Sequence, residues 1–154
     1  MIDKKDKEIL DILQKQGRIS NADLARSLGM APSGVHERVR KLERQGVIEQ
    51  YSARIAPKTV GLTLTTFIQV KTDDLVGCTD AGHALARLPE VLEVHHIAGE
   101  FNYLLKARVA DTDSLTDLLK AIGRISHVRD TRTTLVLGTI KESTVLQIRE
   151  DDSK

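Results

Sequence analysis

The chain has 154 residues, of which 23 are Lys or Arg, 22 are Asp or Glu and 40% are apolar, as in an ordinary globular protein. It contains no apolar run long enough to span a bilayer and no charged-then-apolar leader at the N-terminus, so we expect a cytoplasmic location. The single cysteine, Cys78, offers neither an intrachain disulfide nor a cluster of metal ligands.

Three amphipathic helices are expected in the first 45 residues. The first covers residues 3–15, where Ile9, Ile12 and Leu13, together with Ile2 just before the helix, form an apolar stripe. The second follows Ser20, whose hydroxyl can cap a free amide while Asp23 lies near the positive end of the helix. It ends at Gly29, where a residue without a β-carbon can adopt a left-handed conformation.

The third helix is expected over residues 32–44, because Pro32 suits a first helical turn and Val35, Val39 and Leu42 recur at i, i+4 and i+7. Two short helices joined by a tight turn form a helix-turn-helix, in which the second helix enters the DNA major groove. Gly46 ends this helix, and residues 47–55 are expected to form a short β-hairpin wing.

Polar residues on this helix pair are the candidate DNA contacts, although basic residues on an exposed helix face are often only a solvated surface. The candidates are Ser20, Asn21, Ser33, Gly34, His36, Glu37, Arg38, Arg40, Lys41 and Arg44. The first 50 residues contain ten basic and eight acidic residues, a small positive excess that one copy cannot convert into tight binding. We therefore expect a dimer, in which two copies bind two half-sites together.

After Tyr51 the hydrophobic period changes from about 3.6 to 2, which marks a second domain. Strands are expected over residues 64–71, 91–97, 103–110 and 128–140, with helices over 79–88 and from Asp111 or Thr112 to Gly123. The order βαββαβ is that of a ferredoxin-like fold, so the whole chain is an α+β protein. The expected boundaries are 1–50 for the helix-turn-helix, 51–62 for wing and linker, 63–141 for the ferredoxin-like domain and 142–154 for a tail.

Both domains contain motifs of one known family. They are Asp3 and Asp6 ahead of Ile9-Leu10, Gly17-Arg18-Ile19-Ser20, Leu24-Ala25, Pro32-Ser33, Arg38-Val39, Leu42-Glu43, Gly46-Val47-Ile48, Tyr51, Gly99-Glu100-Phe101-Asn102-Tyr103-Leu104-Leu105 and Thr133-Thr134-Leu135. Together they resemble the leucine-responsive and asparagine-responsive (Lrp/AsnC, feast/famine) transcription factors over residues 2–141. The resemblance implies dimers formed through the C-terminal sheets, often assembled into octamers, and a small effector, usually an amino acid, bound between C-terminal domains.

The resemblance places the effector at the turn between the strands expected over residues 91–97 and 103–110. The positions are Gly99, Glu100, Asn102 and Tyr103, with Thr134, expected near the start of the last strand, as a further hydroxyl. An amino acid needs an anionic acceptor for its ammonium and a cluster of backbone donors for its carboxylate. Asn102 stands where aspartate is usual, which leaves Glu100 as the anion. The alternative is a plain hairpin turn that contributes only to assembly.

Two departures from the family concern the recognition helix: Ala31 replaces the usual serine cap, and Glu37 replaces a basic residue. Alanine is a poor cap, so the helix either starts without a side-chain cap or starts later with Ser33 as its cap. Glu37 repels phosphate but can accept from a cytosine amine, which suggests an altered sequence preference.

We expect no metal site, because His95 and His96 are adjacent on a strand and point to opposite faces. Some tetrapyrrole decarboxylases share this two-domain layout, but no nucleophile-base pair lies at a recognisable spacing, so we expect neither an enzyme nor a cofactor. An architectural DNA-binding protein that responds to no effector remains the main alternative.

Overall fold

The structure is a computed structural model that describes residues 2–75 and 77–148. Contacts divide the chain into two units, which we call the helical unit (residues 1–54 and 141–154) and the sheet unit (residues 55–140). Within the described residues, no helix is both long and apolar enough to cross a membrane.

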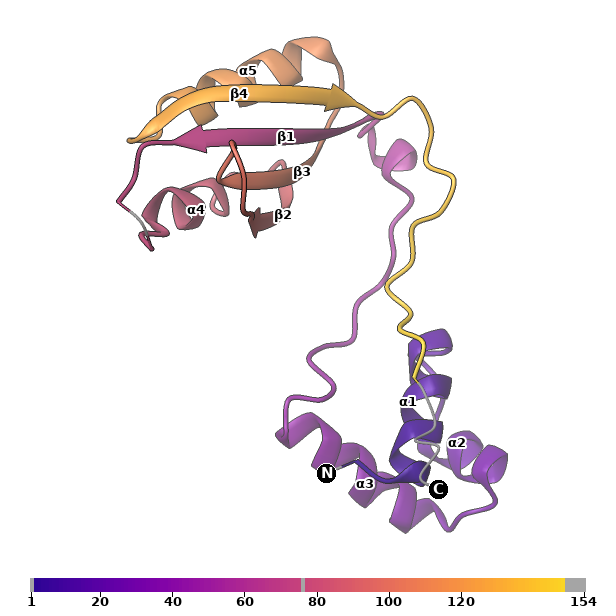
Figure 1. Cartoon of the computed structure of the whole chain (residues 1–154). Helices are drawn as coiled ribbons and strands as arrows, with labels where there is room; N and C mark the ends of the chain where they lie inside the picture. Colours follow the sequence, from indigo (N-terminus) through magenta and orange to yellow (C-terminus); the bar gives the residue numbers. More distant parts are fainter. Residues whose placement is uncertain (1, 76, 149–154) are drawn as a thin grey trace. The chain divides into compact units, whose positions relative to one another are not determined.

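The helical unit contains α1 (Lys4–Lys15), α2 (Asn21–Leu28) and α3 (Pro32–Arg44), which pack around one apolar cluster (Figure 1). Ile9 of α1, Leu24 of α2 and Val35 and Leu42 of α3 are fully buried in it. Burial of a side chain of this size contributes about 1.5–3 kcal/mol. The three predicted helices and the apolar faces of α2 and α3 are confirmed.

Local hydrogen bonds fix where these helices begin and end. Ser20 Oγ accepts from the backbone N–H of Asp23 at 3.0 Å, and Gly29 ends α2 in the left-handed region with φ of 62°. At α3 the N-cap residue is Ala31, which supplies no side-chain hydrogen bond, so the helix starts on Pro32 alone. The Gly29 turn is as the sequence predicted, and of the two starts that the sequence left open for α3 the structure has the uncapped one at Ala31.

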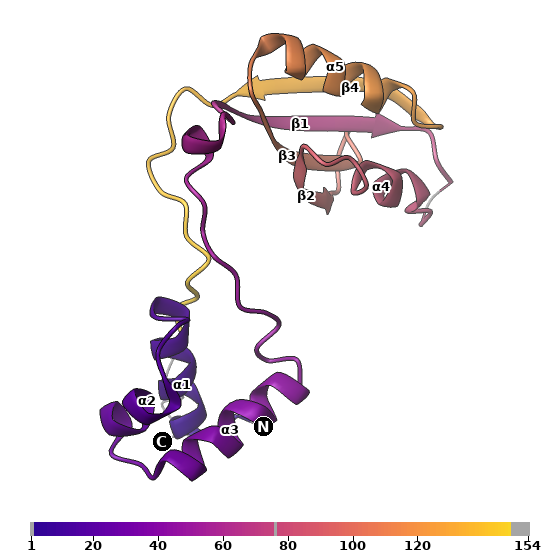
Figure 2. The same ribbon diagram turned by 180° about the vertical axis from the view of Figure 1, so that it is seen from behind.

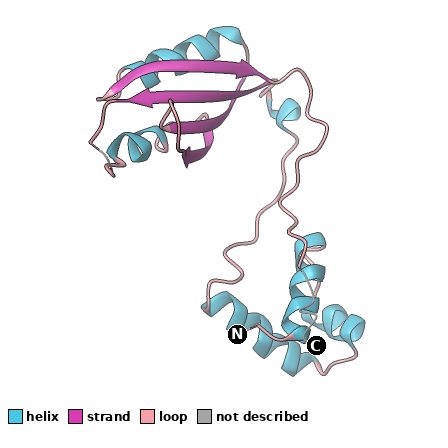
Figure 3. Ribbon diagram, in the orientation of Figure 1, coloured by secondary structure: helices cyan, strands magenta, loops and turns pink. Residues whose placement is uncertain are grey.

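The predicted β-hairpin over residues 47–55 is wrong, because residues 45–56 contain no strand (Figure 3). The N–H groups of Val47 and Ile48 instead donate back to the Leu42 carbonyl at 2.9 and 3.2 Å, which continues the end of α3. Tyr51 then donates from its hydroxyl to Glu43 of α3 at 3.0 Å. The segment thus follows α3 and does not pair with itself.

Residues 141–148, which we call the return segment, belong to the helical unit. Gln14 of α1 donates from Nε2 to the Leu146 carbonyl at 3.1 Å and accepts from the Leu146 N–H at 2.6 Å. Ile148 packs against the apolar cluster of the three helices. Leu146 and Ile148 of the return segment are therefore part of the packing of the helical unit.

The sheet unit contains, after the 3₁₀ helix η1 (Pro57–Val60), the order βαββαβ. Its elements are β1 (Leu64–Thr72), α4 (Asp80–Leu85), β2 (Val91–His96), β3 (Tyr103–Val109), α5 (Thr112–Gly123) and β4 (Val128–Leu135). The sheet order is β2-β3-β1-β4, and all neighbours are antiparallel. Both helices cover the same face of the sheet (Figure 2), so the predicted ferredoxin-like arrangement is confirmed.

The covered face of the sheet is apolar and its other face is mixed. Ile68 and Val70 of β1 and Leu105 of β3 are fully buried against the helices, as the alternation in the sequence predicted. On the other face Phe67 is exposed and lies between Lys106 of β3 and Thr134 of β4 in the register.

Two elements are shorter than predicted. Helix α4 ends at Leu85 and not at residue 88, because Arg87 and Leu88 form tight turns that bond three residues back, just ahead of Pro89. Strand β4 ends at Leu135 and not at residue 140. The Val136 N–H still donates to the Thr65 carbonyl at 3.0 Å, but β1 begins at Leu64, opposite residue 137 in the register, and offers no partner to residues 138–140.

Candidate DNA-binding and effector surfaces

The outward face of α3 is the candidate DNA-binding surface. Ser33, Glu37, Arg40 and Arg44 recur at three- and four-residue spacing, so they lie along one line of the helix, and all four are exposed. Arg40 and Arg44 form no ion pair within residues 2–75 and 77–148. Their guanidinium groups are therefore available to an outside acceptor, and a guanidinium matches guanine O6 and N7 or a phosphate.

Arg38 has a different environment from the other arginines of α3. Its Nη1 donates to Asp3 Oδ2 at 2.6 Å and to Asp6 Oδ1 at 2.7 Å. Asp6 is fully buried, and Lys41 Nζ lies 3.8 Å from its other oxygen. We call Asp3, Asp6 and Arg38 the anchoring cluster, because they join α3 to the start of α1.

The same two aspartates cap α1. Asp3 Oδ1 accepts from the N–H of Asp6 at 2.8 Å, and Asp6 Oδ2 accepts from the N–H of Asp3 at 3.1 Å. Hydrogen bonding from Arg38, followed by the bond from the Asp6 N–H, lowers the pKa of Asp3 below its ordinary 3.8. The stability that this charge provides is complete above about pH 4 and is lost as the pH falls through the lower folded-state pKa.

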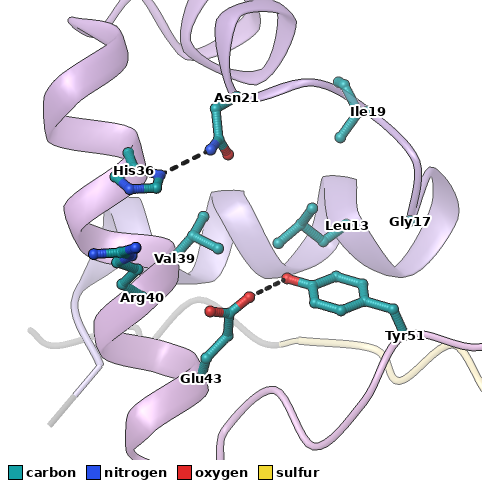
Figure 4. A pocket seen from close by; sticks show the side chains of 9 residues that line it. All are labelled: Leu13, Gly17, Ile19, Asn21, His36, Val39, Arg40, Glu43 and Tyr51. Carbon is teal, nitrogen blue, oxygen red and sulfur yellow. Dashed lines mark hydrogen bonds between the residues drawn. The ribbon is translucent and has the colours of Figure 1, made fainter.

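On one flank of α3 lies a small pocket of about 230 Å³ between the three helices and Tyr51 (Figure 4). Asn21, the first residue of α2, donates from its amide to His36 Nδ1 at 3.0 Å. This bond places the remaining ring proton of a neutral His36 on Nε2. Burial, followed by the bond to Glu43, raises the pKa of Tyr51 above 10.0.

Three other residues predicted to contact DNA have contacts within the helical unit. Ser20 is the α2 cap, and Gly34 is half-buried beside the Met30 side chain. Lys41 is half-buried and turned toward Asp6. The structure thus leaves His36, Glu37, Arg40 and Arg44, with Ser33, as the polar groups on the open face of α3.

At the predicted effector turn, the structure brings together only part of the expected set. Gly99 and Glu100 are exposed, Gly99 has a φ of 140°, and Glu100 Oε1 lies 3.7 Å from Lys71 Nζ. Asn102 instead supports the sheet, because its Oδ1 accepts from the N–H of Thr72 at 2.7 Å and its N–H donates to the Val70 carbonyl at 2.9 Å.

Tyr103 is directed into the core. Only 2% of it is exposed, and its ring stacks on His96 with centroids 5.2 Å apart. A β-carbon at Gly82 of α4 would lie 2.6 Å from this ring, so α4 needs glycine where it crosses β3. Burial raises the pKa of Tyr103 above 10.0.

Thr134 lies away from the turn, near the end of β4 and not near its start as the sequence suggested. It pairs with Phe67, whereas Asn102 bonds to Val70 and Thr72, three and five residues further along β1. Three to five residues of strand span roughly 10–17 Å. Thr134 and the turn are therefore not one site within a single sheet unit.

The two adjacent histidines point to opposite faces, as predicted. His95 Nε2 lies 3.1 Å from Glu93 Oε2 on the open face, whereas His96 stacks on the buried Tyr103. Among the described residues, no group of three or more His, Cys, Asp or Glu is placed to hold a metal ion.

Sequence comparisons match both halves of the chain. The family model described as a winged helix-turn-helix DNA-binding domain matches residues 2–49, and the Lrp/AsnC ligand binding domain matches residues 65–146. The leucine-responsive regulatory protein of Escherichia coli K12 is 39% identical over 96% of this chain and 92% of its own length. The chain belongs to the Lrp/AsnC family.

Solved structures of Lrp/AsnC regulators have the same fold. A transcriptional regulator from Neisseria meningitidis in complex with L-methionine is 32% identical, with a TM-score of 0.88 over 96% of this chain and 97% of that one. A feast or famine regulatory protein from Mycobacterium tuberculosis, also in complex with L-methionine, is 37% identical, with a TM-score of 0.86 over 92% and 96%. The chain is a DNA-binding transcriptional regulator with an effector-binding domain.

Sequence reasoning missed the role of the residues that hold α3 in place. Asp3 and Asp6 have the spacing of a capping box, which was a usable signal, but nothing local indicated that Arg38, 35 and 32 residues further along the chain, is their partner. The contacts of Glu43 with Tyr51 and of Gln14 with Leu146 had no local signal.

Replacement of Arg38 by alanine is expected to lower the free energy of unfolding of the helical unit by about 3 kcal/mol, because it leaves the buried Asp6 carboxylate with only the Lys41 ammonium, 3.8 Å away, to compensate its charge. Hydrogen exchange of the α1 and α3 amides measures this opening directly. The control is Arg26→Ala, which removes an exposed pair with Asp23 and is expected to change stability by under about 0.5 kcal/mol. Equal effects of the two substitutions would contradict the anchoring role.

Proposed function

We propose that this regulator binds duplex DNA as a homo-oligomer in the cytoplasm, with α3 in the major groove, and that an amino acid bound to the sheet unit alters DNA binding. The observation that carries the proposal is the pair of exposed guanidinium groups, Arg40 and Arg44, on a helix whose other arginine is already bound. Arg38 is therefore left out of the proposed contact set, despite its place in the motif.

The chemistry of the exposed face supports direct recognition of bases. Arg40 and Arg44 offer paired donors to guanine, His36 offers one N–H donor, and Glu37 offers an acceptor to a cytosine amine. The combination of donors and an acceptor favours a G·C-containing half-site. A net positive charge this small makes a single copy weak, so two or more copies are needed.

The surface of the sheet unit supports self-association. Leu137 and Ile140, beyond β4, are fully exposed, and Phe67 is exposed on the open face of the sheet. Large apolar side chains exposed on the sheet and just beyond its last strand are candidates for burial against another copy. We propose that copies of the chain join through the sheet units, first as dimers and then as octamers.

For the effector we propose an amino acid held at the turn after β2, where Glu100 is the exposed anion for the ammonium. The methionine bound by the relatives from N. meningitidis and M. tuberculosis supports this ligand class. Asn102 and Tyr103 contribute by shaping the turn from behind, since both are bonded or packed within the unit. Thr134 joins such a site only from a second copy.

Replacing both Arg40 and Arg44 by alanine is expected to weaken binding to a duplex selected from a random pool by at least about tenfold, because each bidentate contact to a base contributes about 1–3 kcal/mol. Fluorescence anisotropy of the labelled duplex at fixed salt measures the affinity, and light scattering is expected to show an unchanged oligomer.

The matched control removes two exposed arginines of the sheet unit, as Arg87→Ala with Arg124→Ala. It changes the net charge equally and is expected to leave the affinity within about twofold. If both doubly substituted chains bind equally, α3 does not contact DNA through this face and the proposal fails.

L-methionine is expected to raise the melting temperature of the unchanged protein, because a ligand that binds only the folded state stabilises it, by about 2.7 kcal/mol at 100 times its Kd. Glu100→Gln is expected to abolish the shift, since it removes the charge that faces the ammonium. Differential scanning calorimetry with L-methionine, L-leucine and L-asparagine in turn makes the comparison.

The control for charge is Asp117→Asn on the exposed side of α5, which should retain the full shift. A shift that survives in Glu100→Gln would move the ligand away from this turn. The absence of any shift with all three amino acids would favour the effector-independent architectural protein.

A further inference from the structure

The chain passes between its two units twice, once after Arg54 and once before Lys141. A domain linked by residues 55–63 alone would have a single tether. Here the second passage ends in the return segment, whose Leu146 bonds to α1 and whose Ile148 packs against the apolar cluster of the three helices.

The first attachment of the return segment is to α1. Gln14 forms two hydrogen bonds with the backbone of Leu146, one in each direction, at 3.1 and 2.6 Å. The two residues are 132 positions apart, so the contact closes nearly the whole chain. Two residues further on, Ile148 is half-buried against the apolar cluster of the three helices.

The second attachment joins the outgoing and returning passages to each other. Arg54 Nη1 donates to the Glu142 carbonyl at 2.7 Å, and Nη2 donates to Glu142 Oε2 at 3.1 Å. Three residues earlier, Tyr51 is bonded to Glu43 of α3. Arg54 is largely exposed, so this pair alone contributes little, and the attachment depends on all of these contacts together.

We propose that the return segment is a strap that limits rotation of α3 relative to the sheet unit. Two tethers that are joined at Arg54 and Glu142 leave far fewer orientations than one flexible linker, because the second closure removes conformational freedom. The proposal rests on the proposed DNA binding in one respect. Two recognition helices match two half-sites at lower entropic cost when each is held in orientation.

The test measures rotation of the helical unit directly. A dye is attached to Ser27→Cys on α2, in a chain whose single native cysteine is removed as Cys78→Ser, and time-resolved anisotropy is recorded on the intact oligomer. Chains that stop after Lys141 or after Ile148 are compared with the full chain. The longer truncation is the matched control, because it keeps the contacts of Gln14, Arg54 and Ile148.

We expect the chain ending at Lys141 to gain a nanosecond motion that lowers the residual anisotropy at least about twofold, while the chain ending at Ile148 matches the full chain. Equal residual anisotropy in all three chains would overturn the proposal. So would a change in oligomer size by light scattering in the shorter chain, because the segment would then act through assembly.

A full-length variant tests the same contacts without a truncation, so its result does not depend on whether the shortened chain folds. Gln14→Ala with Arg54→Ala removes both polar attachments and is expected to release the same motion. Its control is Gln16→Ala with Arg129→Ala, which changes the same residue types outside the strap, since Arg129 pairs with Asp73 in the sheet unit. Release in both variants, or in neither, would contradict the strap.

DNA-binding measurements with one and two half-sites distinguish failure of the strap from failure of the proposed function. Release of the strap is expected to weaken binding to a duplex with two half-sites by about tenfold and to leave binding to one half-site unchanged. Failure of the unchanged chain to bind any duplex would refute the proposed function, whereas the anisotropy result still decides the strap. Equal loss at one and two half-sites would mean that the segment supports the fold of the helices only.

Discussion

The orientation of the recognition helix depends on one buried charge interaction, that of Asp6 with Arg38. Asp6 is fully buried at the first turn of α1, and Arg38 is the group that compensates its charge while also holding the cap residue Asp3. Because a buried carboxylate is costly without a partner, α3 has one favoured rotation about its axis. That rotation turns Val35, Val39 and Leu42 inward and Arg40 and Arg44 outward.

The cations of α3 are thereby divided between two tasks. Arg38 contributes to folding, Lys41 lies near the same aspartate, and Arg40 and Arg44 remain for a ligand with acceptor groups. A count of basic residues on α3 would overestimate the positive charge that is available to DNA, since part of that charge is neutralised within the unit. The outward face of α3 therefore carries two guanidinium groups and the Glu37 carboxylate, a small local excess of positive charge.

Features set by neighbouring residues were predictable from the sequence, and features set by distant contacts were not. The bounds of α3, the Gly29 turn and the alternation of β1 follow from local patterns, and the structure confirms them. The β-hairpin expected after α3 was wrong, because these residues bond to Leu42 and Glu43 and not to each other. Nothing local in Tyr103 separates a ligand contact from a core residue beneath α4.

The same distinction applies to the candidate sites. The DNA-binding face could be predicted as a set of polar positions on one helix, but the exclusion of Arg38 required the position of α1. The effector turn could be placed by its motif, whereas the bond from Asn102 to β1 and the distance of Thr134 depend on the register of the sheet. Family motifs thus locate a site, and packing decides which of its side chains are available.

The central claim, that α3 uses Arg40 and Arg44 for DNA and Arg38 for folding, is tested most directly by arginine-specific chemical modification followed by mass spectrometry. In the free protein Arg40 and Arg44 should react readily and Arg38 slowly. On addition of duplex DNA, Arg40 and Arg44 should become protected while Arg38 keeps its slow rate. Protection of Arg38 only when DNA is bound, with Arg40 and Arg44 still reactive, would contradict the account.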